Sequence, residues 1–561
     1  MSTRQERGRD VVRQSGLTSI AAALAIASGL LLDIVVVQRF GATARTDAFA
    51  QAALIPLGVV AIVMVGANQA LVPTITTWLI RKGREETWRL CSTLVFAALA
   101  AGVLMAAIAA TIAWPLMRIA SPGFGPEEVR FAASLTRVMF LIVPLVAVAE
   151  VLRALLNARY SFFAPAFMNV VMNGVAAAIV IGWGTSLTAV AWAYVVGAGA
   201  QTLFMLVMAV ARGGFRPRAT IALRDPEVRA AGRLLVRPLA GAGLNPLARV
   251  GERALVSFFP SGALTLLAYG YRLISAIGGS VLFRSVMVAL LPRLTEEGRQ
   301  QDRASFRATT QLGVRIMLVI SMPLTALMGV LAVPATIAVF DRGNLSRDEA
   351  ALLGAALAVY AASIVGSAWQ RAMLAPFFAT MDTRVPLRNT VYGVMANLAL
   401  VPLLVLPFGR GDADGIVGVA AAYSLAQYVN VAHAWYRMRH DLDIHLDGMR
   451  AFVARLVVAT AVMAAVLVAG YAALDLGDPH GRWLLLGLTV TVASASLVVF
   501  ALTLWMIGGG EFADLTRSFR RRSGRRGVDP LLEAQAEPAT MPGPGRGSGA
   551  GQGPAAPDSR T

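Results

Sequence analysis

The chain is poor in the residues that build disulfides, metal centres and redox sites. It contains 1 cysteine, Cys91, and 4 histidines among 561 residues. A single cysteine excludes a disulfide within the chain and a cysteine-based metal cluster, and four histidines leave little material for a histidine-rich site. The sequence also lacks a Walker loop, a G-x-S-x-G elbow and an H-E-x-x-H helix. We therefore expect a transporter rather than an enzyme, with no metal site and no bound cofactor.

Charged residues are scarce too. They make up 15% of the chain, whereas a soluble domain carries about 25%. In their place 57% of the residues are apolar, and the mean hydropathy is +0.65. The apolar residues form runs of about 20, the length that crosses a hydrocarbon layer of about 30 Å. Such runs lack the alternation of a membrane barrel, so the sequence predicts an all-α polytopic membrane protein.

Apolar runs separated by charges or by Gly, Pro and Asn clusters predict about fourteen transmembrane helices. Their centres lie at 17–38, 50–78, 90–114, 131–156, 164–183, 187–211, 234–258, 263–291, 311–339, 350–378, 387–407, 415–438, 452–474 and 483–508.

The basic residues indicate how these helices are oriented. With a cytoplasmic N-terminus, the inner segments hold 30 Lys and Arg residues and the outer segments hold 8. This excess alternates from loop to loop, as the positive-inside rule requires. We therefore attribute the net charge of +18 to topology and expect no nucleic-acid partner. Both termini are expected to be cytoplasmic.

The chain repeats itself at an offset of about 219 residues. Asp33 then aligns with Glu252, and QALVP at 69–73 aligns with VALLP at 288–292. Further along, at an offset of about 221, Pro165 aligns with Pro386. The offset covers six spans, an even number, so the two copies share one orientation and form two facing lobes in a parallel pseudo-repeat. Two lobes that rock about a shared interface are the physical basis of alternating access.

This repeat divides the chain into segments of different character. We expect an N-terminal cytoplasmic segment (1–16), an N-lobe (17–211), a basic cytoplasmic linker (212–233), a C-lobe (234–438), two additional C-terminal helices (450–508), and a basic juxtamembrane segment with a disordered cytoplasmic tail (509–561). The tail is rich in Pro, Gly and Ala and has too few large apolar residues to pack. The arginines at 517–526 are expected to contact anionic lipid headgroups.

Ionisable residues inside the apolar runs are candidate ligands. A charge at the bilayer centre costs about 2.5–3.5 kcal/mol, so such a group normally faces a wet or paired interior. The candidates are Arg249, Glu252 and Arg253 in the seventh span, Arg272 in the eighth, Asp33 in the first and Asp47 at the start of the second. Guanidinium donates paired hydrogen bonds to phosphate and keeps its charge. A cationic cavity between the lobes therefore predicts a phosphorylated substrate.

Structural roles are the alternative for these residues. Glu252 can neutralise Arg249 or Arg253 as an assembly pair, and amide side chains inside helical bundles often join helices. Secondary candidates, each open to such a role, are Gln38, Arg39, Asn169, Asn173 and Arg284.

A set of short motifs resembles the MurJ/MviN family. The motifs are FGA at 40–42 followed by TDAF at 46–49, QALVP at 69–73, SPGF at 121–124, FFAPAF at 162–167, YRL at 271–273, LPRL at 291–294 and MDTRVP at 381–386. The similarity covers about residues 15 to 445 in order, and the set is specific although each motif alone is weak.

The resemblance implies a flippase for lipid-linked peptidoglycan precursors, within the multidrug/oligosaccharidyl-lipid/polysaccharide exporter superfamily. It implies a cationic cavity for a pyrophosphate and sugar headgroup, and two C-terminal helices that form a groove for the undecaprenyl tail. It also implies the bacterial inner membrane and a cycle driven by membrane potential, with Na⁺ or H⁺ as the candidate coupling ion. Arg272 matches the family's essential arginine in helix eight, and Asp47 matches a functional acid.

The chain departs from the family pattern at positions where the family carries arginine. Leu32 precedes the acid of the first span, Gln38 lies near that span's outer end, and Val59 and Val60 follow the proline of the second span. Two corners of the family's arginine cluster are therefore missing, and Arg249 and Arg253 are candidates to replace them.

Together these observations predict a lipid II flippase, expected to be a monomer. A flippase for another polyprenyl-linked glycan is the alternative that the missing arginines leave open. A cation-coupled multidrug exporter predicts a cavity dominated by acids, which the arginines contradict. A membrane glycosyltransferase would need a catalytic acid and a sizeable polar loop, whereas the longest internal loop, at about 212–233, is short and basic.

Overall fold

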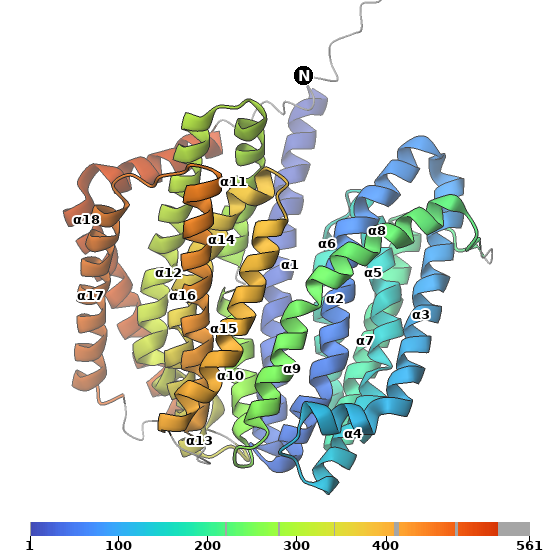
Figure 1. The fold of residues 1–561 in the computed structure, drawn as a ribbon, viewed down its shortest axis with the longest axis horizontal. Coiled ribbons are helices and arrows are strands. Elements are labelled where there is room, and N and C mark those ends of the chain that lie inside the picture. The colour runs from blue at the N-terminus through green and yellow to red at the C-terminus, as the bar shows by residue number, and fades with distance from the viewer. Residues whose placement is uncertain are drawn as a thin grey trace, which may run out of the picture. The chain divides into compact units, whose positions relative to one another are not determined.

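A computed structural model describes residues 2–218, 222–278, 281–341, 343–408, 414–476 and 481–524, and the regular elements within them are helices (Figure 1). The chain divides into two compact units, Met1–Ile507 and Gly508–Thr561. All features discussed below lie in the first unit. The predicted all-α class is confirmed.

The helices follow one another with short connections. The first half contains α1 (Ser2–Phe40), α2 (Ala44–Arg81), α3 (Gly83–Ala120), α4 (Pro126–Met139), α5 (Ile142–Ala158), α6 (Phe163–Trp183) and α7 (Leu187–Ala211). The second half contains α8 (Pro226–Ala242), α9 (Leu244–Val256), α10 (Ala263–Gly278), α11 (Val281–Arg299), α12 (Arg303–Phe340), α13 (Arg347–Tyr360), α14 (Ala362–Ala379), α15 (Arg384–Phe408) and α16 (Gly415–Asp441). Two further helices are α17 (Met449–Ala473) and α18 (Arg482–Gly524).

Twelve stretches of the described residues are long and apolar enough to cross a membrane, and they match twelve of the predicted spans. The count of fourteen is not confirmed. The predicted spans at 234–258 and 263–291 each correspond to two helices, α8 with α9 and α10 with α11. Of these, α8, α9 and α10 have 17, 13 and 16 residues, fewer than the about 20 that a membrane crossing needs. The charges that mark these spans as candidate sites also lower their hydropathy.

Both lobes contain an interrupted helix at the same place in the repeat. In the first lobe α4 ends at Met139 and α5 begins at Ile142, while in the second α13 ends at Tyr360 and α14 begins at Ala362. The two breaks are separated by the offset of about 221 residues found in the sequence. The internal repeat therefore extends from the sequence to helix geometry.

Helices α8 and α9 follow each other along the chain, but α8 packs on the first lobe, whereas α9 contacts both lobes. Helix α8 packs against α2, and α9 packs against α15. Helix α8 begins at Pro226, inside the segment expected to be a linker. Its first turn is attached to α2 by a hydrogen bond from Trp78 Nε1 to Glu227 and by an ion pair between Lys82 and Glu227 of 3.2 Å. These donors lower the pKa of Glu227.

The two lobes contact each other at the end where α1 meets α2 and α9 meets α10, opposite the label N in Figure 1. Asp47 of α2 accepts hydrogen bonds from the backbone N–H groups of Gly262 and Thr265, each at 2.7 Å, and from the Thr265 hydroxyl. A carboxylate from the first lobe thus caps the N-terminus of α10, where it satisfies free donors and complements the helix dipole.

A second contact at this end joins α1 to the last turn of α12 and to the segment that follows it. Gln38 Nε2 donates to the Val339 carbonyl at 2.9 Å, and the Asn344 N–H donates to the Gln38 carbonyl at 2.9 Å. By the arginine distribution of the loops, this end is the one expected to face outward.

Candidate functional site

A cavity of about 820 Å³ lies between the two lobes. This volume is within the range of small-molecule sites, about 300–1,000 Å³. Its lining comes from α2 and α7 on one side and from α9, α10, α14, α15 and α16 on the other, with Ala242 at the end of α8. The two sides differ sharply in chemistry.

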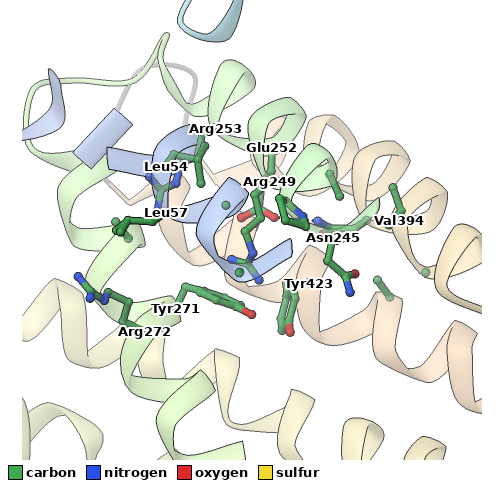
Figure 2. A pocket seen from close by; sticks show the side chains of 18 of the residues that line it. Leu54, Leu57, Asn245, Arg249, Glu252, Arg253, Tyr271, Arg272, Val394 and Tyr423 are labelled. Carbon is green, nitrogen blue, oxygen red and sulfur yellow. Dashed lines mark hydrogen bonds between the residues drawn. The ribbon is translucent and has the colours of Figure 1, made fainter. Parts of the chain in front are cut away.

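The α2 wall of the cavity is apolar. Its lining residues recur along one helix face, and they are Phe49, Ala50, Ala53, Leu54, Leu57, Gly58, Ala61 and Val65. Figure 2 shows Leu54 and Leu57 on this wall. Val59 and Val60 lie outside the lining and pack against a buried cluster that contains Ala106 and Phe140. The first lobe therefore contributes no charged side chain from α2 to the cavity.

The opposite wall carries the charges. The charged residues that line it are Arg249, Glu252 and Arg253 of α9, Arg272 of α10 and Arg371 of α14. Four arginines and one carboxylate make this side of the cavity cationic. Such a wall attracts an anion and disfavours a cationic substrate.

Arg272 joins the two lobes across the cavity. Its Nη1 lies 2.5 Å from Oδ1 of Asp33 in α1, and it also hydrogen bonds Tyr194 of α7. The Asp33 side chain is 6% exposed, whereas the Arg272 side chain is 42% exposed and lines the cavity. The guanidinium is thus positioned by a buried acid while part of it stays accessible to a ligand.

Arg253 is held by backbone rather than by a carboxylate. Its Nη1 donates to the Ala50 carbonyl of α2 at 2.7 Å. Figure 2 shows Arg253 next to Leu54. Because the bond uses one donor of five, the remaining N–H groups of this residue are available to an anion.

Arg249 lies on an aromatic ring. Its guanidinium carbon is 3.1 Å from the centroid of the Tyr271 ring, and Figure 2 shows the two side by side. Its neighbour Glu252 accepts a hydrogen bond of 2.8 Å from Asn397 Nδ2. Among the described residues, neither Arg249 nor Arg253 forms an ion pair with Glu252. The assembly pair considered from the sequence is therefore not formed.

The remaining sequence candidates lie outside the cavity lining. Asp47 and Gln38 join the lobes at the end expected to face outward, as described above. Arg39 donates to the Val180 and Ile181 carbonyls at 2.8 and 3.1 Å and so caps the end of α6. Asn173 donates to Ser28 Oγ at 3.3 Å, which joins α6 to α1.

Two other candidates are simpler to place. Asn169 lies on α6, is partly buried and does not line the cavity. Arg284 belongs to α11, but its side chain is outside the part of the chain that the structure describes.

Sequence reasoning missed the aromatic and amide residues of the cationic wall. Tyr423, Gln427 and Asn430 line the cavity from α16, and Tyr271 lies next to Arg272 on α10. The three α16 residues are spaced at i, i+4 and i+7, which places them on one helix face. A polar stripe at this spacing in an apolar run was the signal that could have identified them.

The family model described as "Lipid II flippase MurJ" matches residues 36–475 of the chain. A probable lipid II flippase MurJ of Rhizobium meliloti (strain 1021) is 27% identical over 533 residues, which cover 90% of this chain and 95% of that protein. The lipid II flippase MurJ of Burkholderia cenocepacia is 26% identical over 412 residues, 70% of this chain and 78% of that protein.

Solved structures share the fold. A structure described as lipid II flippase MurJ in an inward closed conformation aligns with a TM-score of 0.71 at 16% identity, covering 87% of this chain and 99% of that chain. An inward-facing multidrug resistance transporter of the MATE family aligns with a TM-score of 0.61 at 14% identity, covering 77% of this chain and 98% of that one.

Proposed function

Since the chain belongs to the lipid II flippase MurJ family, we propose that it moves undecaprenyl-diphosphate-linked headgroups, most simply lipid II, from the cytoplasmic to the outer leaflet. The observation that carries this proposal is the cavity between the lobes, with Arg249, Arg253 and Arg272 on one wall. Arginine suits a diphosphate because its planar fork donates paired hydrogen bonds to phosphate oxygens.

The physical task is to move a polar headgroup through a layer that does not solvate it. The headgroup enters the cavity, where the arginines replace the water around its charges, while the polyprenyl tail stays in the bilayer. Rocking of the lobes then transfers the opening from one membrane face to the other. During this step the contacts that Asp47 and Gln38 make at the outer end must break.

The tail and the surrounding lipid belong to the same proposal. Helix α17 packs against α12, where Arg315 lies over the Phe452 ring at 5.1 Å from its centroid. We assign the tail to a groove beside α17 and α18, and the arginines at 517–526 to anionic headgroups. The protein acts in the bacterial inner membrane with both termini cytoplasmic, as a monomer and without a nucleic-acid partner.

We also propose that Na⁺ or H⁺ couples the cycle to membrane potential through Glu252. This carboxylate is 5% exposed and lines the cavity between Arg249 and Arg253. The Oδ1 atom of Asn397, whose amide nitrogen binds Glu252, has no hydrogen-bond donor among the described residues. Carboxylate and amide oxygens are ligands suited to a hard cation, and a bound diphosphate would neutralise the flanking arginines that otherwise repel it.

The test is complementation of a bacterial strain depleted of its own lipid II flippase. The wild-type chain should restore growth, and Arg253→Ala and Arg272→Ala should reduce headgroup translocation in proteoliposomes by at least about tenfold, because an arginine–phosphate contact contributes on the order of 1.5–3 kcal/mol. Arg137→Ala is the matched control, since Arg137 donates to the Ala110 carbonyl away from the cavity. Full activity of both cavity variants would refute the proposal.

A flippase for another polyprenyl-linked glycan is the second candidate. The departures from the family pattern favour it, because the residues at which the family carries arginine are here Leu32, Gln38, Val59 and Val60. Export of a different glycan polymer without rescue of the depleted strain would support this alternative.

A further inference from the structure

The cationic wall of the cavity contains an aromatic cluster formed by three tyrosines. The rings of Tyr271 and Tyr423 meet edge to face with their centroids 5.6 Å apart, and Tyr423 packs in the same way on Tyr360 at 5.6 Å. Tyr360 is fully buried, whereas Tyr271 and Tyr423 line the cavity. Tyr271 is thus held through Tyr423, which packs on the buried Tyr360, and Tyr271 itself lines the cavity with one ring face against Arg249.

Arg249 covers that face. Its guanidinium carbon lies 3.1 Å from the Tyr271 centroid, whereas Arg272 is paired with Asp33 and Arg253 is bound to the Ala50 carbonyl. Among the described residues no ion pair fixes Arg249 to a carboxylate. A cation held only by a ring is easily drawn to a doubly charged anion, because a charge-assisted hydrogen bond is stronger than a cation–π contact.

Neutral polar groups continue the wall beyond the rings. Gln427 and Asn430 follow Tyr423 on the same face of α16 and line the cavity. The Asn430 residue is 6% exposed, and its Oδ1 has no donor among the described residues. Buried acceptors of this kind normally have a partner. A ligand with hydroxyl or amide N–H groups would supply one.

We propose that Tyr271, Tyr423 and Asn430 form a carbohydrate subsite, and that Arg249 covers the Tyr271 ring when the cavity is empty and leaves it when the diphosphate binds. The sugar attached to the diphosphate then stacks its apolar C–H face on Tyr271. Its hydroxyl or acetamido groups donate to the amides of α16. This inference rests on the proposed function and adds to it the part of the headgroup that determines specificity.

The opposite wall explains why the stack would form on this side. The α2 residues facing the cavity are aliphatic apart from Phe49, so they offer a sugar neither hydrogen bonds nor a second ring at mid-wall. Tyr271 also adjoins Arg272 in sequence, which places a ring and a phosphate-binding fork one residue apart on α10. A diphosphate and its first sugar are neighbours in the same way.

The experiment compares two probes on the full-length protein in nanodiscs. One probe is undecaprenyl diphosphate, and the other is the same lipid with a single N-acetylhexosamine on the diphosphate. The measured quantity is the ratio of the two dissociation constants. In the wild type we expect the glycosylated lipid to bind about tenfold more tightly, equivalent to about 1.4 kcal/mol.

The variants separate the ring from the charge. Tyr271→Leu should bring the ratio close to one, whereas Tyr271→Phe, which keeps the face, should retain it. Arg249→Ala should weaken both lipids and leave the ratio unchanged. Tyr392→Leu is the matched control, because Tyr392 is 49% exposed on α15 and does not line the cavity.

The outcomes distinguish this inference from the proposed function. If the wild type binds neither lipid, the proposed function fails. If it binds both lipids equally, or if Tyr271→Leu keeps the wild-type ratio, the sugar subsite is refuted while the diphosphate site stands. Unfolding temperatures of Tyr271→Leu and Tyr271→Phe that agree with each other establish that the comparison concerns binding.

Discussion

At the scale of single residues, charges inside the protein have two distinct tasks. The cavity is lined by Arg249, Arg253 and Arg272. The carboxylate of Asp47, by contrast, is occupied by hydrogen bonds from the N-terminus of α10. A buried carboxylate that accepts three hydrogen bonds is a structural group in this state. Its chemistry matters for how the lobes are joined rather than for contact with a headgroup.

This assignment gives a prediction for Asp47→Asn. Asparagine keeps one acceptor oxygen but directs an NH₂ group at a backbone N–H of α10, and it removes the charge that complements the helix dipole. We expect a loss of about 1–2 kcal/mol, seen as a lower unfolding temperature of the purified protein.

Asp348→Asn is the matched control for that change. Asp348 is also an acid in the first turn of a helix, but it is exposed, so its replacement should stay within about 0.5 kcal/mol. Equal shifts in the two variants would contradict the capping role of Asp47.

Sequence reasoning reached the charged residues of the cavity but not their partners. Arg249 and Arg253 were selected because a charge in an apolar run is costly, and this argument needs no fold. Tyr271 and Asn430 are uncharged, so the argument from the cost of a charge does not select them. Their role depends on which helix face meets the cavity, and that is a property of packing between α10 and α16.

At the scale of helices, close backbone approach determines where glycine is required. Helices α6 and α7 pack together, and a Cβ at Gly197 of α7 would lie 2.5 Å from the Met172 carbonyl oxygen of α6. At Gly199, two residues along the same helix, a Cβ would meet nothing within 4 Å. Gly197 is therefore required by the close contact between the two helices, whereas Gly199 is not, although their sequence surroundings are similar.

Alanine substitution separates these tasks. Gly197→Ala must push the α6 backbone away, so it should destabilise the protein by about 1–3 kcal/mol. Gly199→Ala should be neutral or stabilise by up to about 1 kcal/mol through helix propensity. Thermal unfolding in detergent measures both, and a Gly197→Ala protein as stable as the Gly199→Ala protein would contradict the contact.

The span count illustrates what hydropathy alone misses. Twelve of the predicted spans match helical stretches long and apolar enough to cross a membrane, because each is one long apolar run or a pair of well-aligned runs, such as α4 with α5. The pairs α8 with α9 and α10 with α11 differ, since they carry the arginines of the site. Charged site residues inside the membrane lower the hydropathy of the segment that carries them, and hydropathy is the property by which a span is recognised.

At the scale of the whole first unit, the lobes are joined at one end and enclose a cavity between them. Asp47 and Gln38 make contacts at this end, in addition to the Arg272–Asp33 ion pair beside the cavity, and the orientation proposed from the loop charges puts this end at the outer membrane face. The cavity should therefore be accessible from the cytoplasm and sealed from outside. The one cysteine, Cys91, is buried, so reporter cysteines can be introduced into a Cys91→Ala background.

A cysteine at Leu57 tests this arrangement. In inside-out vesicles, Leu57→Cys should react with a membrane-impermeant thiol reagent, and in intact spheroplasts it should stay unlabelled. Glu127→Cys, exposed at the start of α4, and Tyr160→Cys, exposed after α5, report the outer and inner faces respectively. Labelling of Leu57→Cys from outside only would contradict both the orientation and the closed outer end.

Because one cavity wall is charged and the other is apolar, the two lobes contribute differently to substrate binding. In the proposed cycle, a headgroup bound by α9, α10 and α16 moves together with the second lobe, while the apolar face of α2 slides past it. Substitutions in the second lobe alone would then be enough to change substrate specificity. A compound that binds to the apolar face of α2 would therefore block the conformational change without competing with the substrate for its binding site.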